Sequence, residues 1–207
     1  MSEIADRIAG LYDRNAARFD AQRGRKLVEK AWLDRFLALA ASGARVLDIG
    51  CGAGEPIARY TLECGFALTG VDCAPAMIDI CRRRFPGADW IVADMRKLSL
   101  RRRFGALIAW DSFFHLPRDA QRRMFRVFAE HAEPGAPLMF TCGPAEGEAV
   151  GVLFGEPLFH ASLGEAEYRA LLAAAGFAML AFAREDPHCG GRTICLAQET
   201  RYGAAAG

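Results

Sequence analysis

Three glycines at alternate positions give the strongest chemical signal in this chain of 207 residues. Gly50, Gly52 and Gly54 follow the apolar run 46–49 and precede a stretch with helical periodicity. In an open parallel sheet, ligands bind just beyond the carboxyl ends of the strands. Glycines permit backbone conformations closed to other residues and let a ligand approach the main chain closely. We therefore expect this turn to accept a large, flat ligand.

The residues around the turn favour a ligand without phosphate. A dinucleotide-binding turn places its third glycine at position 55, where this chain has Glu55. A carboxylate there would repel a pyrophosphate and would already neutralise the helix dipole that attracts phosphate. No lysine follows the glycines as a nucleotide-binding P-loop requires. A nicotinamide-dependent oxidoreductase nevertheless stays open as an alternative.

The run Leu47-Asp48-Ile49-Gly50-Cys51-Gly52-Ala53-Gly54 resembles the first motif of class I S-adenosylmethionine-dependent methyltransferases, which has an acid two positions before the first glycine. The resemblance extends over residues 45–116 in its motifs and over nearly all the rest in its pattern of strands. It implies an enzyme that uses S-adenosyl-L-methionine as methyl donor, yields S-adenosyl-L-homocysteine, and transfers the methyl group in line to a small molecule. A module that binds this cofactor without turnover is the other alternative.

The resemblance implies a role for an acid or apolar residue after each of the first four expected strands. Asp72 corresponds to the acid that binds both ribose hydroxyls, Met77 to the residue packed on adenine, and Asp94 with Met95 to the pair that holds the adenine amino group and one ring face. Singly, Asp72 reads equally well as a turn acid, Met77 as a core residue and Asp94 as a helix cap. The full set of expected cofactor-binding residues is Tyr12, Arg25, Asp48, Gly50, Cys51, Gly52, Gly54, Asp72, Cys73, Met77, Asp94, Met95, Trp110 and Asp111.

The segment 12–20 resembles the opening of many small-molecule methyltransferases of this family, where a tyrosine and later basic residues cover the carboxylate end of the cofactor. Tyr12 matches that tyrosine. Arg23 or Arg25 can supply the cation, and a solvated helix end explains either residue equally well.

Histidines are the candidate acid–base groups, because imidazole titrates near neutral pH. His160 lies just before an expected helix, and His115 follows the fourth expected strand, near the sulfonium that the family would place there. We take both as candidate catalytic residues, against positioning or packing roles. His131 is expected to be a helix-end residue that interacts with the helix dipole.

Other features narrow the acceptor and the cofactors. The family's enzymes that methylate amino nitrogens of bases carry an Asn/Asp-Pro-Pro-aromatic tetrad after the fourth strand, whereas this chain has Asp111-Ser112-Phe113-Phe114. The net charge of +1 supplies no general attraction to nucleic acid or to an anionic membrane. The four histidines show no metal-ligand spacing. We expect a small-molecule acceptor, no nucleic-acid partner and no metal.

Short apolar runs alternate with amphipathic stretches, as in a parallel sheet with crossover helices. Two helices are expected before the first strand, at residues 4–19 and 26–41. Strands are expected at residues 45–49, 67–71, 89–92, 106–110, 137–141, 179–184 and 192–197. Further helices are expected at residues 56–64, 75–85, 118–132 and 165–175. The last two strands are separated by too short a loop for a crossover and should form an antiparallel hairpin.

The pattern indicates an α/β fold, and the resemblance implies that it is Rossmann-like: a seven-stranded, mostly parallel sheet of order 3-2-1-4-5-7-6 with strand 7 antiparallel, helices on both faces and an N-terminal helical cap. We expect a single domain over residues 1–207. Residues 1–41 form the cap, 44–142 the cofactor-binding half, 143–162 a substrate loop or surface connection, and 163–199 the last helix and terminal hairpin.

Cysteine usage and hydropathy set the expected compartment. The seven cysteines are odd in number and scattered, which favours neither disulfides nor zinc. No stretch has the length of a signal peptide or a membrane span. The sequence therefore predicts a cytoplasmic enzyme without membrane contact, present as a monomer or homodimer.

Overall fold

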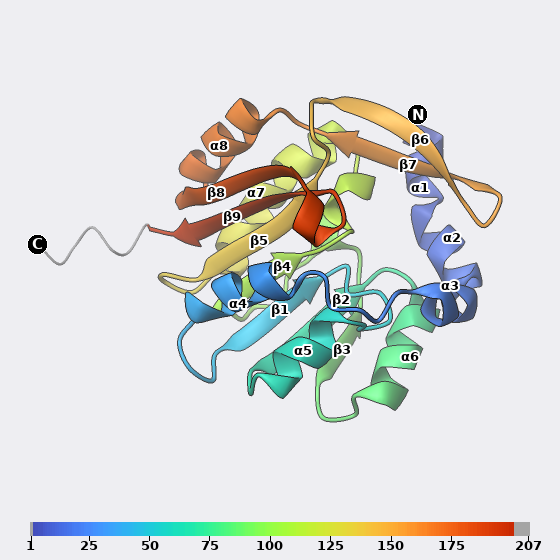
Figure 1. The fold of residues 1–207 in the computed structure, drawn as a ribbon, viewed down its shortest axis with the longest axis horizontal. Helices are drawn as coiled ribbons and strands as arrows, with labels where there is room; N and C mark the ends of the chain where they lie inside the picture. Colours follow the sequence, from blue (N-terminus) through green and yellow to red (C-terminus); the bar gives the residue numbers. More distant parts are fainter. Residues whose placement is uncertain (1, 201–207) are drawn as a thin grey trace, which may run out of the picture.

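The protein, seen in a computed structural model that describes residues 2–200, is built on one seven-stranded sheet. The strand order is β3-β2-β1-β4-β5-β9-β8, and a separate two-stranded sheet is formed by β6 and β7. Strand β9 runs antiparallel to both β5 and β8, whereas the other neighbours are parallel. The predicted order and the antiparallel last strand are confirmed (Figure 1).

The strands and helices lie close to the predicted positions. The main sheet comprises β1 Arg45–Ile49, β2 Ala67–Asp72, β3 Asp89–Val92, β4 Ala106–Ala109, β5 Pro137–Cys142, β8 Phe177–Asp186 and β9 Arg192–Glu199. Helices α5 Ile57–Glu63, α6 Pro75–Arg84 and α7 Arg118–His131 follow β1, β2 and β4, and α8 Glu165–Ala174 precedes β8. Short 3-10 turns occur at Met95–Lys97, Phe113–His115 and Pro187–Cys189.

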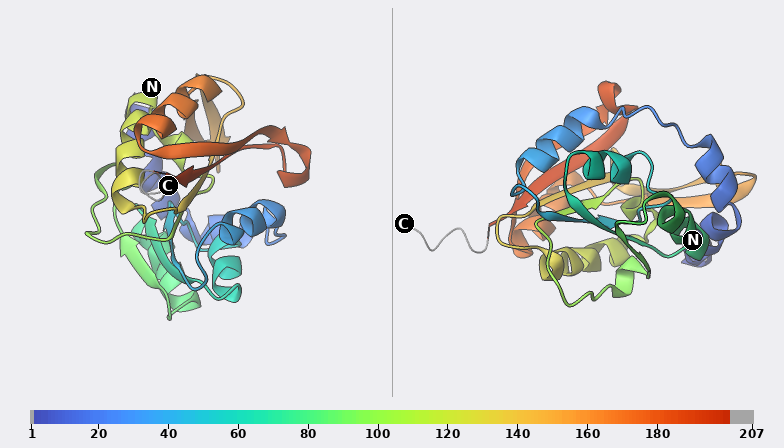
Figure 2. Two further views of the ribbon diagram at one scale, coloured as in Figure 1. Left: turned by 90° about the vertical axis from the view of Figure 1, so that its left-hand side faces the viewer. Right: turned by 90° about the horizontal axis from the view of Figure 1, so that it is seen from below.

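Helices cover both faces of the main sheet (Figures 1 and 2). Side chains alternate along a strand, so β1 sends Val46 to the face under α4 Lys30–Ala38 and α5, and Leu47 to the face under α7 and α8. Val46 and Leu47 are both fully buried. Strands that are buried on both faces appear in the sequence as continuous apolar runs.

The N-terminal cap differs from the prediction. The single helix expected at residues 4–19 is three short helices, α1 Ser2–Asp6, α2 Ile8–Arg14 and α3 Ala16–Gln22, with breaks at Arg7 and Asn15. The second predicted helix, residues 26–41, is shorter and corresponds to α4. The breaks let the chain bend over the carboxyl ends of the strands, where α2 and α3 contact α6 and α1 contacts β7.

The segment 143–162, expected to be irregular, contains a β-hairpin of β6 Gly147–Leu153 and β7 Glu156–Ser162. Leu153 pairs with Glu156, and the two residues between them, Phe154 and Gly155, both have positive φ. That backbone is typical of a tight two-residue hairpin turn. Most of β6 is exposed, so it lacks the apolar alternation that marks a strand in sequence. The hairpin lies beside α1 and α2 (Figure 1).

A buried polar network joins the hairpin to helices α7 and α8. The Tyr168 hydroxyl donates to Gln121 Oε1 (2.8 Å) and accepts from the Leu163 amide (3.0 Å). The Gln121 amide donates to the carbonyls of Leu116 (2.9 Å) and Ala161 (2.8 Å). This network fixes the end of the hairpin against the segment that follows β4.

Replacing Tyr168 by Phe should destabilise the protein by about 1–3 kcal/mol, because Gln121 Oε1 and the Leu163 amide lose a buried partner. Urea unfolding of the variant measures the loss. Tyr60→Phe is the matched control: its hydroxyl bonds Asp34 at the surface and its removal should leave stability nearly unchanged. Equal stability of the Tyr168→Phe variant and the parent would contradict this role of the network.

Candidate active site

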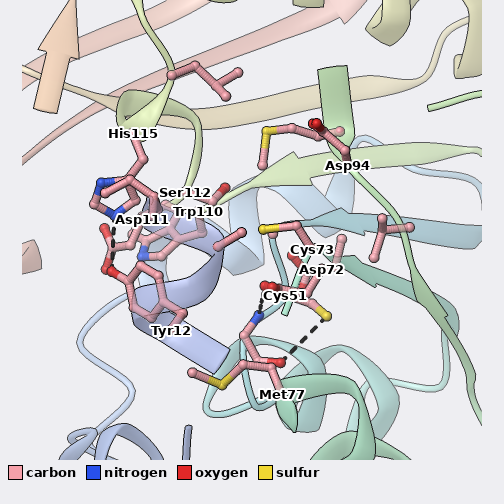
Figure 3. Close-up of a pocket in the computed structure, with 18 of the residues that line it drawn as sticks. Tyr12, Cys51, Asp72, Cys73, Met77, Asp94, Trp110, Asp111, Ser112 and His115 are labelled. Carbon is pink, nitrogen blue, oxygen red and sulfur yellow. Dashed lines mark hydrogen bonds between the residues drawn. The ribbon is translucent and has the colours of Figure 1, made fainter. Parts of the chain in front are cut away.

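A cleft opens at the carboxyl ends of β1, β2, β3 and β4, where the strand order reverses between β1 and β4. This is the place where open α/β sheets bind ligands. Its empty volume is about 1150 Å³ with the open mouth included. The predicted residues that line it are Tyr12, Asp48, Gly50, Cys51, Gly52, Asp72, Cys73, Met77, Asp94, Met95, Trp110, Asp111 and His115 (Figure 3).

The glycine turn forms the floor of the cleft, and its glycines do different things. Gly50 has φ +80°, and a Cβ there would lie 2.3 Å from the Ser112 Cβ, so no side chain fits. Gly52 has φ +52°, which strains any other residue, and the atom nearest to a Cβ at this position would be 3.9 Å away, so the glycine keeps the floor open. Gly54 faces Phe85 on the far side and serves packing; it does not line the cleft.

Asp72, at the end of β2, holds the turn in place. Its Oδ2 accepts from the Gly52 amide and its Oδ1 from the Ala74 amide, both at 2.9 Å. Burial raises the pKa of this carboxyl, while the amide hydrogen bonds oppose the shift. Each oxygen keeps a lone pair, so the carboxylate can still accept from a ligand in the cleft.

Asp48 lies within β1 and is a buried acid of the cleft. Its side chain is 2% exposed, and burial, with the nearby Asp72 charge, raises its pKa to about 7. A carboxyl in this setting favours a cationic ligand, because a cation restores the ionised form that burial disfavours.

Asp94 and Cys73 lie on the opposite wall from the Tyr12 side (Figure 3). The Asp94 carboxylate caps the short turn at Met95–Lys97 and is paired with the Arg96 guanidinium, which lowers the pKa of the carboxyl despite partial burial. Desolvation of the Cys73 thiol, together with the neighbouring Asp72 charge, raises the pKa of that thiol to about 12. Met77 is buried beneath them on α6.

The far end of the cleft brings together residues from four elements. The Tyr12 hydroxyl lies 3.1 Å from His115 Nε2, and His115 Nδ1 lies 2.8 Å from the Phe159 carbonyl on β7. Beside them, the Asp111 carboxylate receives Arg192 (2.8 Å) and Arg23 (3.3 Å). Burial lowers the pKa of His115 to about 4, so the ring is neutral at pH 7.

Besides Gly54, two further predicted residues lie outside the cleft. Arg25 does not line the cleft; its guanidinium is 3.4 Å from Glu55 and 3.5 Å from Asp20. Arg23, the alternative weighed with it, is the arginine that does line it. His160 also lies outside the cleft, with its ring 5.0 Å from the His115 ring and 5.3 Å from the Phe114 ring.

Glu55 behaves differently from the prediction. Its side chain is almost fully buried, and Arg59 binds it with two nitrogens at 2.6 and 2.9 Å, with Arg25 and Arg84 nearby. Helix α5 begins only at Ile57. The carboxylate is thus compensated by cations, and its charge alone does not exclude a phosphate ligand.

Sequence reasoning missed Arg192 and Ser112. Arg192 begins β9 and reaches Asp111 from 81 positions away, so no local pattern marks it. The Ser112 hydroxyl donates to the Ile49 carbonyl (2.7 Å) and ties the ends of β1 and β4 together. Gly50 was the one sequence feature that could have indicated this contact, because a side chain at position 50 would collide with Ser112.

Within residues 2–200, no group of three or more histidine, cysteine or acidic side chains is arranged to hold a metal ion. Over the same residues no helix is long and apolar enough to cross a membrane.

Comparisons with known proteins agree with the geometry. Residues 46–135 match the methyltransferase domain family. The chain is 33% identical over 92 residues to a dTDP-3-amino-3,4,6-trideoxy-α-D-glucopyranose N,N-dimethyltransferase of Streptomyces venezuelae, and 30% identical over 95 residues to a malonyl-[acyl-carrier protein] O-methyltransferase of Serratia marcescens. These matches span 44% and 45% of this chain, but only 38% and 36% of the two relatives.

The solved structure of CalS10, an amino pentose methyltransferase from Micromonospora echinaspora with SAM bound, superimposes with a TM-score of 0.70 at 21% identity, over 90% of this chain and 96% of that one. This likeness concerns the fold. Residues 46–135 thus match a methyltransferase domain, and the sheet order and the cleft at its switch point agree with the predicted resemblance to the class I S-adenosylmethionine-dependent methyltransferases.

Proposed function

We propose that the protein transfers a methyl group from S-adenosyl-L-methionine to a small-molecule acceptor. The observation that carries this proposal is a cleft whose floor is the glycine turn, flanked by two carboxyls, the buried Asp48 and the half-buried Asp72, whose pKa values are both raised. The donor is a nucleoside with two ribose hydroxyls, a sulfonium and an ammonium. Two acids in a closed space suit its hydroxyls and its positive charges.

Each part of the donor can be placed beside residues of the cleft that suit its chemistry. Asp72 would accept from the ribose hydroxyls, and Met77 and Met95 would enclose the adenine near Asp94. Asp48 and the Gly50 turn would face the cationic end, and Arg23 its carboxylate. Trp110, Asp111, Tyr12 and His115 would then surround the reacting methyl group. When bound, the donor supplies an electrophilic methyl carbon; the protein's task is to orient an acceptor and exclude water.

In this proposal the two histidines position other side chains and do not transfer protons. His115 is neutral at pH 7, and its two nitrogens are already engaged by Tyr12 and the Phe159 carbonyl. Burial also lowers the pKa of His160, which packs against His115. We therefore assign His115 to hold Tyr12, and His160 to support His115, in place of acid–base roles for either.

A small acceptor is supported by the surroundings of the cleft. The cap helices and the β6–β7 hairpin, which we take as the acceptor-side element of a single domain, lie over its far end. Arg82, Arg84 and Arg102, from the two arginine runs, are each paired with a carboxylate, which leaves no phosphate-tracking stripe among them.

Titration calorimetry with S-adenosylmethionine and with NAD is the first test. Binding of the former alone supports the proposal, and binding of NAD alone would favour an oxidoreductase. Transfer of a labelled methyl group to a metabolite panel then separates an enzyme from a module that binds the cofactor without turnover.

Replacing Asp72 by Ala should weaken S-adenosylmethionine binding by about 1.5–3 kcal/mol, because a charged acceptor of the ribose hydroxyls is lost. The same change removes the partner of the Gly52 amide, so loosening of the turn adds to the loss. Calorimetry measures the affinity, and Asp79→Ala, which changes an exposed acid on the helix that follows β2, is the control. Unaltered affinity in the Asp72 variant would refute this cofactor placement.

The affinity for S-adenosylmethionine should depend on pH through Asp48. Its pKa of about 7 lies far above the usual 3.8, and a cationic ligand binds the ionised carboxyl. Affinity should therefore be full above pH 7 and fall as the pH drops, by at most about tenfold per unit for one proton. Asp48→Asn should remove this component of the pH profile, and calorimetry from acid to mildly alkaline pH measures it. Parallel profiles for both proteins would show that Asp48 does not face the cation.

A further inference from the structure

The direction of the hydrogen bonds at His115 is set by the backbone. Nδ1 lies 2.8 Å from the Phe159 carbonyl oxygen, which can only accept, so Nδ1 carries a proton. The buried ring is neutral at pH 7, because burial lowers its pKa to about 4. It therefore holds a single proton, and Nε2 presents a lone pair.

Tyr12 must then donate to that lone pair. Its hydroxyl oxygen is 3.1 Å from Nε2, and burial, with the charges of Asp111 and Asp72, raises the pKa of the phenol so that it stays protonated. The one hydroxyl proton is used in this bond. Toward the cleft, which Tyr12 lines (Figure 3), the oxygen therefore offers only lone pairs.

The charges around this oxygen disfavour an anionic acceptor. In the described part of the chain, the two arginines that line the cleft are paired: Arg23 with Asp111, and Arg96 with Asp94 and Asp6. Arg192, on the other side of Asp111, is likewise bound by that carboxylate. With the donor bound, Arg23 would be shared between Asp111 and the donor carboxylate. A carboxylate acceptor would therefore meet the Tyr12 lone pairs and the Asp111 charge with no further guanidinium of the cleft to offset them.

The same groups favour an amine over an alcohol as the methyl acceptor. Both can donate a proton to the Tyr12 oxygen, but an alcohol becomes a strong nucleophile only when a base removes its proton. His115 is a very weak base, and its Nε2 is already occupied by the Tyr12 proton. An uncharged amine carries its own lone pair and requires no base before the attack.

We propose that the acceptor is an uncharged amine whose N–H is held by the Tyr12 oxygen, with the nitrogen lone pair directed at the donor methyl group. In the step, nitrogen and methyl carbon form a bond while the bond from carbon to sulfur breaks. The electron pair of the broken bond goes to sulfur, which becomes the neutral thioether. The methylated nitrogen becomes an ammonium and loses its proton to water after release. The inference rests on the proposed function, since it takes S-adenosylmethionine as the donor.

The test uses the full chain with isotope-labelled histidine, loaded with S-adenosylhomocysteine. Long-range proton–nitrogen NMR reads which ring nitrogen of His115 is protonated, with its signals assigned from His115→Asn. The sample is titrated at neutral pH with aniline, phenol and benzoate, which share a ring and differ in the polar group. We expect an unprotonated Nε2 whose signal is shifted by aniline at lower concentration than by benzoate. With the methyl donor in place of the product, aniline should be methylated faster than phenol.

Tyr12→Phe should weaken aniline binding by about three- to tenfold, the value of one hydrogen bond, and leave benzoate binding no weaker. Tyr60→Phe, the same change outside the cleft, should alter neither. A protonated Nε2, a stronger response to benzoate, no response to any probe, or faster methylation of phenol would each overturn the amine assignment. Calorimetry of the same samples with S-adenosylhomocysteine keeps the tests apart: failure to bind it would refute the proposed function itself.

Discussion

The site depends first on the Asp72 carboxylate, which joins two loops of the sheet at one point. It receives the Gly52 amide from the loop after β1 and the Ala74 amide from the loop after β2. A partly desolvated charge is tolerated there because two backbone donors stabilise it, although desolvation still raises the pKa of the carboxyl. The acid that would bind the ribose is thus also the residue that shapes the glycine floor.

Around this centre, the N-terminal cap is attached to the sheet by polar contacts at several places. Asp13 accepts from the Ala76 amide at the start of α6 (2.8 Å), and Asp20 binds Arg84 near its end (2.6 Å). Arg84 also donates to the Ala53 carbonyl of the glycine turn (2.8 Å). The cap is therefore positioned relative to the glycine turn by the same helix that carries Met77.

The acceptor end follows a different principle, since it is built from segments far apart in sequence. Phe159 of the β6–β7 hairpin contributes only its carbonyl oxygen to this end. That oxygen sets the tautomer of His115, and the tautomer makes the Tyr12 hydroxyl a donor toward the histidine. Such a chain of donors and acceptors is specific because each buried group has one partner it can satisfy. In the proposal, the neutral Tyr12–His115 pair selects among acceptors by the direction of its hydrogen bonds. The charged groups beside it, Asp111 and its two arginines, are paired with one another.

The sequence by itself determined the strands and the terminal hairpin, because apolar runs are local signals, and its resemblance to the methyltransferases implied the strand order and the cofactor-binding residues. The order is confirmed, and most of those residues line one cleft, because a glycine turn and acids at the ends of strands are also local features. Tertiary structure decided what Glu55, Arg25 and Gly54 do, because the contacts of Glu55 with Arg25 and Arg84, and of Gly54 with Phe85, join segments that are far apart in the sequence. It also decided the hairpin and the orientation of the Tyr12 hydroxyl. An exposed strand has no apolar alternation to reveal it, and the direction of a hydrogen bond depends on a backbone carbonyl 44 residues from the histidine it contacts.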